Sequence, residues 1–446
     1  MRLSILASAT IAVVVAWTGT AQAASLQDAV DKAVSSIPAI GSATARRQSS
    51  EERVRVERGA LFPTVNIRGE TGLQYSDTPG TRRRASRGND DGDTTLWRNE
   101  ARIIVNQLLY DGGTTFNLVD EAQGNLLAAT FRVDDAKRSV ALQAIAAYID
   151  VLRNREFVAI AEGNVTAHER LLGNVRQLVD SGRASDSDVS QGESRLALAE
   201  ANLENRKGEL RDAETRYFRS VGEAPGELDP IPGAPSPGDI DVEGQVQQAV
   251  RLNPELAVAR ALIDAREAAS KATDGLFRPR LEMELSASEG KNLDGVRGRD
   301  TDYRAVLILT WNLYRGGADS ARAREAAANL TAVKFDEADT LRFIRERVEA
   351  SFKSFEKNAA RQGPLTRRVE ENRNLISAYE RQFELGQRTL LDLLDVQNEL
   401  FVSRAELIDA QHSGLFDYYD LLAASGELGP LFGINNTEQV TVKMFE

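Results

Sequence analysis

The chain has 446 residues, a formal net charge of -12 and no cysteine. It therefore forms no disulfide and carries no lipidated cysteine, and its acidic charge argues against nucleic acid as a partner. The histidines His168 and His412 lie far apart in helical stretches without cysteine partners, so we expect neither a metal site nor a cofactor. No nucleotide-binding loop or nucleophile motif is found in the sequence, which argues against an enzyme.

The N-terminus has the pattern of a secretory signal peptide over residues 1–23. Arg2 precedes an apolar run that ends near Trp17, and an Ala-Gln-Ala cleavage site ends at Ala23. The run is too short to span a bilayer, and no later apolar run approaches the roughly 20 residues that a membrane helix needs. We therefore expect a secreted chain without an α-helical membrane span.

The first predicted repeat covers residues 24–223. A helical pattern over residues 26–61 gives way at Phe62 to period-two alternation, which predicts strands over residues 62–76 and 96–109. Each strand has one apolar face and one face with charged residues. We interpret the loop between the strands as solvated, with contact to lipopolysaccharide phosphates as the alternative. Its charged residues are Arg82, Arg83, Arg84, Arg87, Asp90, Asp91 and Asp93.

A long helical hairpin is predicted over residues 114–221. The glycines Gly112 and Gly113 allow the strand to turn sharply into a helix that continues without proline to Asp180. A helix of this length is not stable alone and must pack against partners along coiled-coil-like seams. After a polar turn, a second helix returns from Asp188.

The same order of elements is predicted again after a proline-rich linker. The linker covers residues 224–241, the second repeat residues 242–426 and a tail residues 427–446. Gly363-Pro364 is expected to interrupt and kink the second long helix. The elements expected in the second repeat are a helix over residues 242–276, strands over residues 277–289 and 301–313, and a helical hairpin over residues 318–424.

Two landmarks recur at the same spacing. The Gly-Gly pair that ends at Gly113 recurs at Gly317, and the turn at Gly182 recurs at Gly386. Gly113 and Gly182 are separated by as many residues as Gly317 and Gly386. Two unrelated landmarks do not keep the same spacing by chance, so the sequence indicates a tandem duplication.

The turn of the second hairpin has recognisable capping residues. Gly386 is expected to end one helix, and Thr389 to cap the next, with Asp392 closing a capping box. Asp392 and Asp395 are three positions apart, so both project from one face of the helix. Spacing alone leaves two alternatives: the carboxylates line a pore, or they are solvated residues favoured by the helix dipole.

The amphipathic strands favour a membrane barrel over a soluble sheet. Aromatic residues lie near both strand ends, as in the girdles of membrane barrels, and the strands are long enough to cross the hydrocarbon layer. Four strands cannot close a barrel, and open edges in lipid leave backbone groups unsatisfied. We therefore expect several copies of the chain to share one barrel, and three or more if the polar face lines water.

The chain resembles the TolC-type outer membrane efflux proteins over essentially its whole mature length. The most specific part runs from Gly386 to Asp395, supported by the stretch from Asn312 to Gly317 and by the duplication. The resemblance implies an α+β membrane protein, namely a homotrimer with a barrel of twelve strands in the outer membrane and a periplasmic tunnel of helical hairpins. It also implies two partners, a periplasmic adaptor and an inner-membrane ABC or RND transporter.

The resemblance also implies residue roles. Asp392 and Asp395 would form the pore constriction. Arg388 would latch the closed tip by bonding to Ser187 and Asp188 of the other hairpin. Where the family can carry a tyrosine near this latch, the chain has a residue without a hydroxyl, Phe383. The adaptor would dock on residues of both tips, which are Gly182, Arg183, Ser185, Gly386, Gln387 and Thr389.

The function that these features indicate is export. We expect an outer membrane channel-tunnel of a type I secretion or tripartite efflux system, gated at the periplasmic tips. The lack of a lipidated cysteine favours the secretion branch. The alternative is a periplasmic coiled-coil scaffold or adaptor protein with a soluble sheet.

Overall fold

The computed structural model describes residues 23–85 and 93–434. The predicted signal peptide before residue 23, part of the charged loop and most of the predicted tail lie outside the described residues. The chain divides into two compact units. Among the described residues, the first unit draws on residues 23–37, 140–240 and 351–420, and the second on residues 38–85, 93–139, 241–350 and 421–434.

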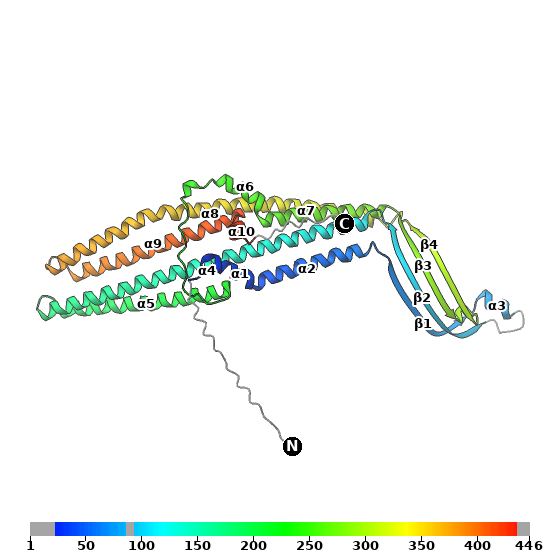
Figure 1. Ribbon diagram of the computed structural model, residues 1–446, viewed down its shortest axis with the longest axis horizontal. Coiled ribbons are helices and arrows are strands. Elements are labelled where there is room, and N and C mark those ends of the chain that lie inside the picture. Colours follow the sequence, from blue (N-terminus) through cyan, green and yellow to red (C-terminus); the bar gives the residue numbers. More distant parts are fainter. Residues whose placement is uncertain (1–22, 86–92, 435–446) are drawn as a thin grey trace, which may run out of the picture. The chain divides into compact units, whose positions relative to one another are not determined.

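The second unit contains one antiparallel sheet with the strand order β1-β2-β3-β4 (Figure 1). Within the described part of the chain, β1 and β4 each pair on one side only, so both outer edges of the sheet are open. All strands predicted from the sequence are present, with their ends displaced by a few residues. Their bounds are β1 Thr64–Ser76, β2 Thr94–Tyr110, β3 Arg280–Lys291 and β4 Arg299–Thr310.

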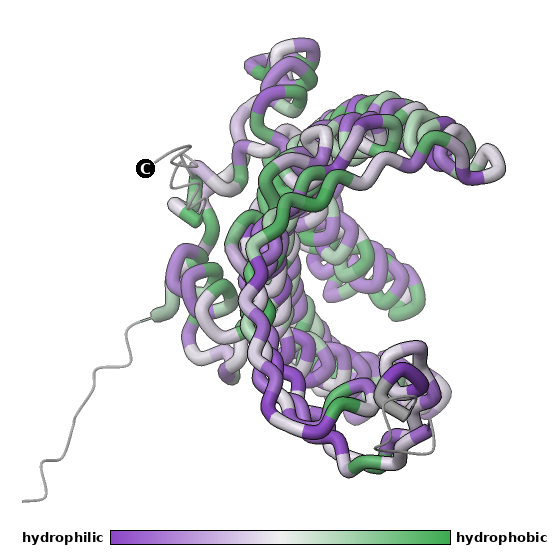
Figure 2. Tube along the Cα trace, turned by 90° about the vertical axis from the view of Figure 1, so that its right-hand side faces the viewer, coloured by the Kyte–Doolittle hydropathy of each residue, from purple (hydrophilic) through white to green (hydrophobic). Residues whose placement is uncertain are grey.

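The sheet has an apolar and a charged face, as the period-two pattern predicts. On the apolar face Ile67 lies opposite Ile103, and Ile67 is 78% exposed. On the charged face Glu100 accepts hydrogen bonds from Arg98 and Arg102, and it is buried beneath them. Figure 2 shows the alternation of hydropathy along the strands. A sheet with a largely exposed apolar face requires a further apolar environment to cover it.

Glycine pairs join the sheet to the long helices. Gly112 has φ 74° and Gly113 has φ 90° where β2 turns into α4 (Thr114–Asp180). A Cβ on Gly112 would lie 2.8 Å from the Cα of Gly275, so the turn needs glycine for space as well as for conformation. The second repeat uses Gly316 (φ 62°) and Gly317 (φ 84°) before α8 (Ala318–Glu384).

The helical hairpins have equal dimensions in the two repeats. Helices α4 and α8 each have 67 residues, and the returning helices α5 (Asp186–Val221) and α9 (Leu390–Ser425) each have 36. Matching lengths in both arms are what a tandem duplication predicts. Among the described residues, no helix combines the length and the apolar character needed to cross a membrane.

The N-terminal segment and the linker meet around one buried tyrosine in the first unit. Ala24 forms a parallel bridge with Leu228 of the linker. The hydroxyl of Tyr148 lies 2.8 Å from the main-chain oxygen of Ala24 and 2.7 Å from that of Asp229. Tyr148 therefore ties both segments to α4, and Tyr217 of α5 packs beside it with ring centroids 6.4 Å apart.

Two helices predicted as continuous are each divided at a proline. The helix expected over residues 26–61 is α1 (Leu26–Ser36) followed by α2 (Pro38–Gly59). The helix expected over residues 242–276 is α6 (Val242–Leu252), α7 (Pro254–Ala272) and the short η2 (Thr273–Phe277). The residues before the prolines, Ile37 and Asn253, are extended with ψ 127° and 120°. A following proline ring disfavours the helical conformation, which explains both breaks.

The interruption predicted at Gly363-Pro364 is wrong, because α8 continues through Pro364. An interior proline removes one backbone hydrogen bond of the helix. A helix of 67 residues has many other hydrogen bonds and packing contacts, so it tolerates that loss. The kink at this position stays a prediction. Short elements also occur in predicted loops, and these are α3 (Pro79–Ala85), η1 (Pro237–Asp239), η3 (Leu293–Gly295) and α10 (Leu428–Phe432).

Candidate functional site

The turn of the second hairpin is closed by backbone hydrogen bonds around Gly386. Its N–H donates to the oxygen of Phe383 at 2.9 Å, and the N–H of Gln387 donates to the oxygen of Gln382 at 2.8 Å. Gly386 has φ 74°, which glycine adopts without strain. These paired bonds are a Schellman motif, so the predicted glycine stop is confirmed.

The first hairpin ends in the same motif. The N–H of Gly182 donates to the oxygen of Val179, and the N–H of Arg183 donates to the oxygen of Leu178, both at 2.8 Å. Gly182 has φ 70°. The two tips therefore share one backbone geometry, and any difference between them lies in the side chains that they present.

Each returning helix begins with a capping interaction. The N–H of Thr389 donates to the carboxylate of Asp392 at 3.1 Å, and the N–H of Asp392 donates to the Thr389 hydroxyl at 3.2 Å. In the first tip, the N–H and the hydroxyl of Ser185 donate to Asp188 at 2.9 and 2.8 Å. These hydrogen bonds favour the charged carboxylates. They hold the pKa of Asp392 (Thr389 hydroxyl, then backbone) and of Asp188 (Ser185 backbone, then hydroxyl) below the usual range.

Within the chain, Arg388 contacts its own hairpin. Its Nε donates to the side-chain oxygen of Gln382 at 3.0 Å, and its guanidinium lies 4.3 Å from the centre of the Tyr379 ring. The predicted latch partners Ser187 and Asp188 instead contact Ser185. Within one chain Arg388 therefore does not contact Ser187 or Asp188. The latch stays a prediction about a contact between neighbouring chains.

The two tips are joined within the chain by a different arginine. The guanidinium of Arg183 donates to the main-chain oxygen of Glu384 at 3.0 Å. Glu384 is the last residue of α8, where backbone carbonyls lack helical partners and carry partial negative charge. Sequence reasoning assigned Arg183 to adaptor docking and did not predict this contact.

Of the two predicted pore aspartates, one has a cationic partner. Asp395 lies 3.4 Å from Arg195 of α5, which is on the other hairpin. Both side chains are exposed, so the pair contributes little stability, on the order of 0 to 1 kcal/mol. Among the described residues Asp392 is hydrogen-bonded to its capping partner Thr389, and the nearby charge of Arg388 also lowers its pKa. The sequence does not predict the contact of Asp395 with Arg195.

An apolar cluster packs the hairpins together directly behind the tips. Leu393 is 2% exposed, and it lies with Leu390 and Leu394 of α9 against Leu171 and Val175 of α4. Phe383, Tyr379 and Val189 pack around this cluster. Phe383 therefore has a packing role here. The aspartates and the leucines occupy different faces of the first turns of α9, so the apolar contact fixes which way the carboxylates point.

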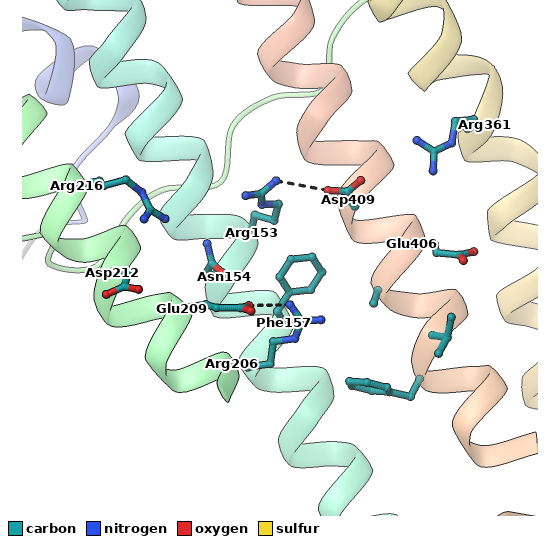
Figure 3. A pocket seen from close by; sticks show the side chains of 13 residues that line it. Arg153, Asn154, Phe157, Arg206, Glu209, Asp212, Arg216, Arg361, Glu406 and Asp409 are labelled. Atoms are coloured by element: carbon teal, nitrogen blue, oxygen red, sulfur yellow. Dashed lines mark hydrogen bonds and ion pairs between the residues drawn. The ribbon is translucent and has the colours of Figure 1, made fainter. Parts of the chain in front are cut away.

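A charged groove lies further along the hairpins, with a volume of about 620 Å³. Arg153 of α4 is 3.4 Å from Asp409 of α9, and Arg206 of α5 stacks over the Phe157 ring at 4.7 Å (Figure 3). No sequence pattern predicts this groove, because single charged residues on helices are ordinarily solvated. Figure 3 also labels Asn154, Glu209, Asp212, Arg216, Arg361 and Glu406 along it.

Among the described residues, no group of three or more His, Cys, Asp or Glu side chains is placed to hold a metal ion. The tips instead present paired turns, exposed polar side chains and carboxylates at helix starts. Duplicated helical hairpins carried by a sheet with one exposed apolar face define a protein of the outer membrane channel class.

The sequence matches the family described as "Outer membrane efflux protein" over residues 29–223 and 245–427. The chain belongs to this family. The matched segments correspond closely to the two predicted repeats, and they leave out the whole of the proline-rich linker.

Individual relatives agree with this assignment. The chain is 26% identical to the outer membrane efflux protein BepC of Brucella suis biovar 1 (strain 1330), covering 92% of this chain and 87% of that protein. It is 24% identical to the alkaline protease secretion protein AprF of Pseudomonas aeruginosa, covering 90% and 84%. The crystal structure of the Campylobacter jejuni CmeC outer membrane channel superposes with a TM-score of 0.79 at 10% identity, covering 90% and 86%.

Family membership confirms the resemblance, the outer membrane location and the function expected from the sequence, a channel-tunnel for secretion or efflux. The members are outer membrane channels rather than enzymes. The alternative of a periplasmic scaffold with a soluble sheet is thereby set aside. The roles of the individual tip residues stay predictions.

Proposed function

We propose that three copies of the chain assemble into one channel, in which their sheets form a single barrel and their hairpins a periplasmic tunnel. The observation that carries this proposal is the sheet itself. It has an exposed apolar face and open edges along β1 and β4. In lipid an open edge leaves backbone groups unsatisfied, so β4 of one copy must pair with β1 of the next.

The charged face supports a water-filled interior. Arg102 donates to Glu100 at 2.6 Å, Arg98 also pairs with Glu100, and Arg68 pairs with Glu70 at 2.7 Å. Charges in such a network are stable beside water and costly beside lipid tails. The charged face therefore lines the lumen. Twelve strands enclose a lumen wide enough for water, whereas eight are filled by their own side chains.

The test is the mass and conductance of the purified oligomer. Light scattering in detergent is expected to give three times the mass of the mature chain, and planar bilayers are expected to show discrete channel events. A monomeric protein that stays in solution without detergent would overturn the proposal.

At the periplasmic end, Asp392 and Asp395 of three copies would form a ring of carboxylates around the axis. Close like charges disfavour one another and attract cations, so the ring would make the closed channel cation-selective and open to block by multivalent cations. Because Asp395 has Arg195 beside it, Asp392 supplies the larger unpaired charge. Asp392→Asn should therefore weaken the block of the channel by multivalent cations more than Asp395→Asn. If the block is unchanged in both variants, the proposal of a carboxylate ring is wrong.

Arg388 would latch the closed state across to Ser187 and Asp188 of a neighbouring hairpin. Among the described residues it contacts Gln382 through Nε and the Tyr379 ring through the face of its guanidinium, so its terminal N–H groups can still donate to a further acceptor. Arg388→Ser is expected to raise single-channel conductance. An unchanged conductance would take Arg388 out of the gate.

The partners in this proposal are a periplasmic adaptor and an inner-membrane ABC or RND transporter. Support comes from the exposed turns of both tips, whose polar groups project beyond the apolar cluster. The relative AprF is named as a secretion protein for alkaline protease, which favours a secretion partner. Cross-linking from a cysteine placed at Gln387 should capture an adaptor in cells, with exposed Val56 of α2 as the control position. If the adaptor is cross-linked from position 56 and not from position 387, the adaptor does not dock on the tips.

A further inference from the structure

A hollow of about 650 Å³ lies on the sheet near the ends of the strands that are far from the helices. Its floor is formed by small residues, since Gly69 lies opposite Ala101 in the β1–β2 ladder. A Cβ built on Gly69 would meet nothing within 4 Å, so the space above it is open. The hollow therefore lies above two small residues, and polar and charged side chains, among them Thr71, Lys291 and Arg299, border it.

The strand register assigns this hollow to the apolar face. Thr71, Asn99, Lys291 and Arg299 lie opposite one another in one row across all strands. That row is an even number of positions from Ile67, Ile103 and Tyr303, so its side chains share their face. In the proposed channel this face meets lipid, and the hollow opens toward the membrane.

The row carries an excess of positive charge. Lys291 and Arg299 lie directly opposite each other, and like charges at such positions destabilise a sheet unless an anion lies between them. Glu289 pairs with Arg299. Within the part of the chain that the structure describes, the Lys291 side chain has no hydrogen-bond or ion-pair partner. On this face the group of Lys291, Arg299 and Glu289 therefore carries one more cation than carboxylate.

Aromatic residues of the apolar face lie on both sides of the row along the strands. Trp97 precedes Asn99 on β2, away from the long helices, and Tyr303 follows Arg299 on β4, toward them. Tryptophan and tyrosine mark the headgroup level in membrane barrels. The Trp97 indole donates to the Thr71 hydroxyl at 3.0 Å, and that hydroxyl donates to Asn99 at 2.7 Å. A hydrogen-bonded polar chain thus borders the hollow on one side.

We propose that this hollow seats the phosphate-bearing headgroup of a glycolipid of the outer leaflet. The phosphate lies between Lys291 and Arg299, the sugar hydroxyls reach the Thr71–Asn99 chain, and the first part of an acyl chain fills the space above Gly69. The inference rests on the proposed trimeric channel, because only that assembly places this face in lipid. The strand ends far from the helices then reach the outer leaflet.

The experiment measures glycolipid bound to the detergent-purified trimer by native mass spectrometry, with diphosphorylated lipid A as the probe. Lys291→Gln combined with Arg299→Gln is expected to lower the affinity by about tenfold or more, since each cation near an anionic headgroup contributes appreciably. Gly69→Leu should lower it as well, by filling the floor without changing charge. The control is Arg304→Gln, because Arg304 is on the same strand, on the opposite face, and paired with Asp302 at 3.0 Å.

Each outcome supports or overturns the proposed binding site. A lower affinity for lipid A in the double variant and in Gly69→Leu, with an unchanged affinity in Arg304→Gln, supports the proposed glycolipid site. Equal binding by all variants overturns it, as does equal binding of lipid A from which the phosphates have been removed. Trimer mass and conductance are recorded on the same samples. A conducting trimer that binds lipid A with and without phosphates equally well overturns only the proposed glycolipid site. Failure to form a trimer overturns the proposed trimeric channel.

Discussion

The guanidinium of Arg183 donates to the main-chain oxygen of Glu384 at 3.0 Å, which joins the turn of the first hairpin to the end of α8 in the second. The contact spans the two repeats within one chain. A tip that opens by separating its hairpins must break it, along with the apolar cluster behind it.

We therefore expect Arg183→Gln to favour the open tip. An exposed hydrogen bond of this kind contributes about 0.5 to 1 kcal/mol, and three copies acting together would raise closed-state conductance by roughly threefold or more. Single-channel recording measures the change. Arg176→Gln is the matched control, because Arg176 pairs with Glu193 inside one hairpin at 2.7 Å. Equal conductance in both variants would mean that Arg183 does not restrain the tip.

The second prediction concerns the apolar cluster. Leu393 is 2% exposed, so Leu393→Ala removes packing and leaves a cavity, at a cost of about 2 to 5 kcal/mol. Leu391, two positions earlier, is 44% exposed, and its replacement by alanine should change stability by less than about 0.5 kcal/mol. Hydrogen exchange over the first turns of α9 compares the two variants. Similar exchange in both would show that the hairpins do not depend on this cluster.

The third prediction separates capping from the carboxylate ring. Because capping depresses the pKa of Asp188 and Asp392, the stability that each cap adds is present above the ordinary aspartate pKa of about 3.9 and is lost as pH falls through the lower folded value. Of these two capping carboxylates, only Asp392 belongs to the proposed ring, so repulsion between like charges would raise the pKa of Asp392 and not that of Asp188. In the trimer, the Thr389 amide should then lose protection from exchange at a higher pH than the Ser185 amide.

The dissociated chain provides the control for that comparison. Without neighbours both caps should open at similar pH, since their hydrogen bonds are alike. Identical midpoints in the trimer would contradict a carboxylate ring at Asp392.

The fourth prediction concerns the buried tyrosine of α4. Tyr148→Phe removes the hydroxyl that holds Ala24 and Asp229, and should cost about 1 to 2 kcal/mol. Exchange of the Asp229 amide, which donates to Ala24 at 3.1 Å, should rise about tenfold. Tyr314→Phe is the control, because Tyr314 is 85% exposed. An unchanged Asp229 amide would show that the bridge holds without the hydroxyl.

The same residue gives a stability effect at alkaline pH. Burial, then the charge of Asp229, raises the pKa of Tyr148 from 10.0 to about 12. A raised folded pKa favours the neutral phenol, so this contribution is complete below pH 10 and is lost as pH rises through about 12. Urea unfolding at stepped pH should show the loss in the natural chain and not in Tyr148→Phe.

Features that depend on near neighbours in the sequence were predictable. The Gly386 stop and the Thr389–Asp392 cap use hydrogen bonds that span a few residues, and period two specifies the strands wherever one face is apolar. The effect of proline is predicted wrongly in both directions. The apolar pattern continues past Ile37-Pro38, where the helix ends, whereas α8 continues through Pro364, where a break is expected. The tie from Arg183 to Glu384 was not predictable, since it depends on how two distant hairpins pack.

The duplicated turns have a consequence for symmetry. Both hairpins end in one backbone motif, at Gly182 and at Gly386, yet an arginine sits directly after the first glycine and a glutamine after the second. A trimer would therefore present six hairpin tips with nearly the same backbone, which alternate between tips with an arginine and tips with a glutamine after the glycine. A binding protein that arrives in three copies could select one kind by side chain alone, while one that arrives in six must tolerate both.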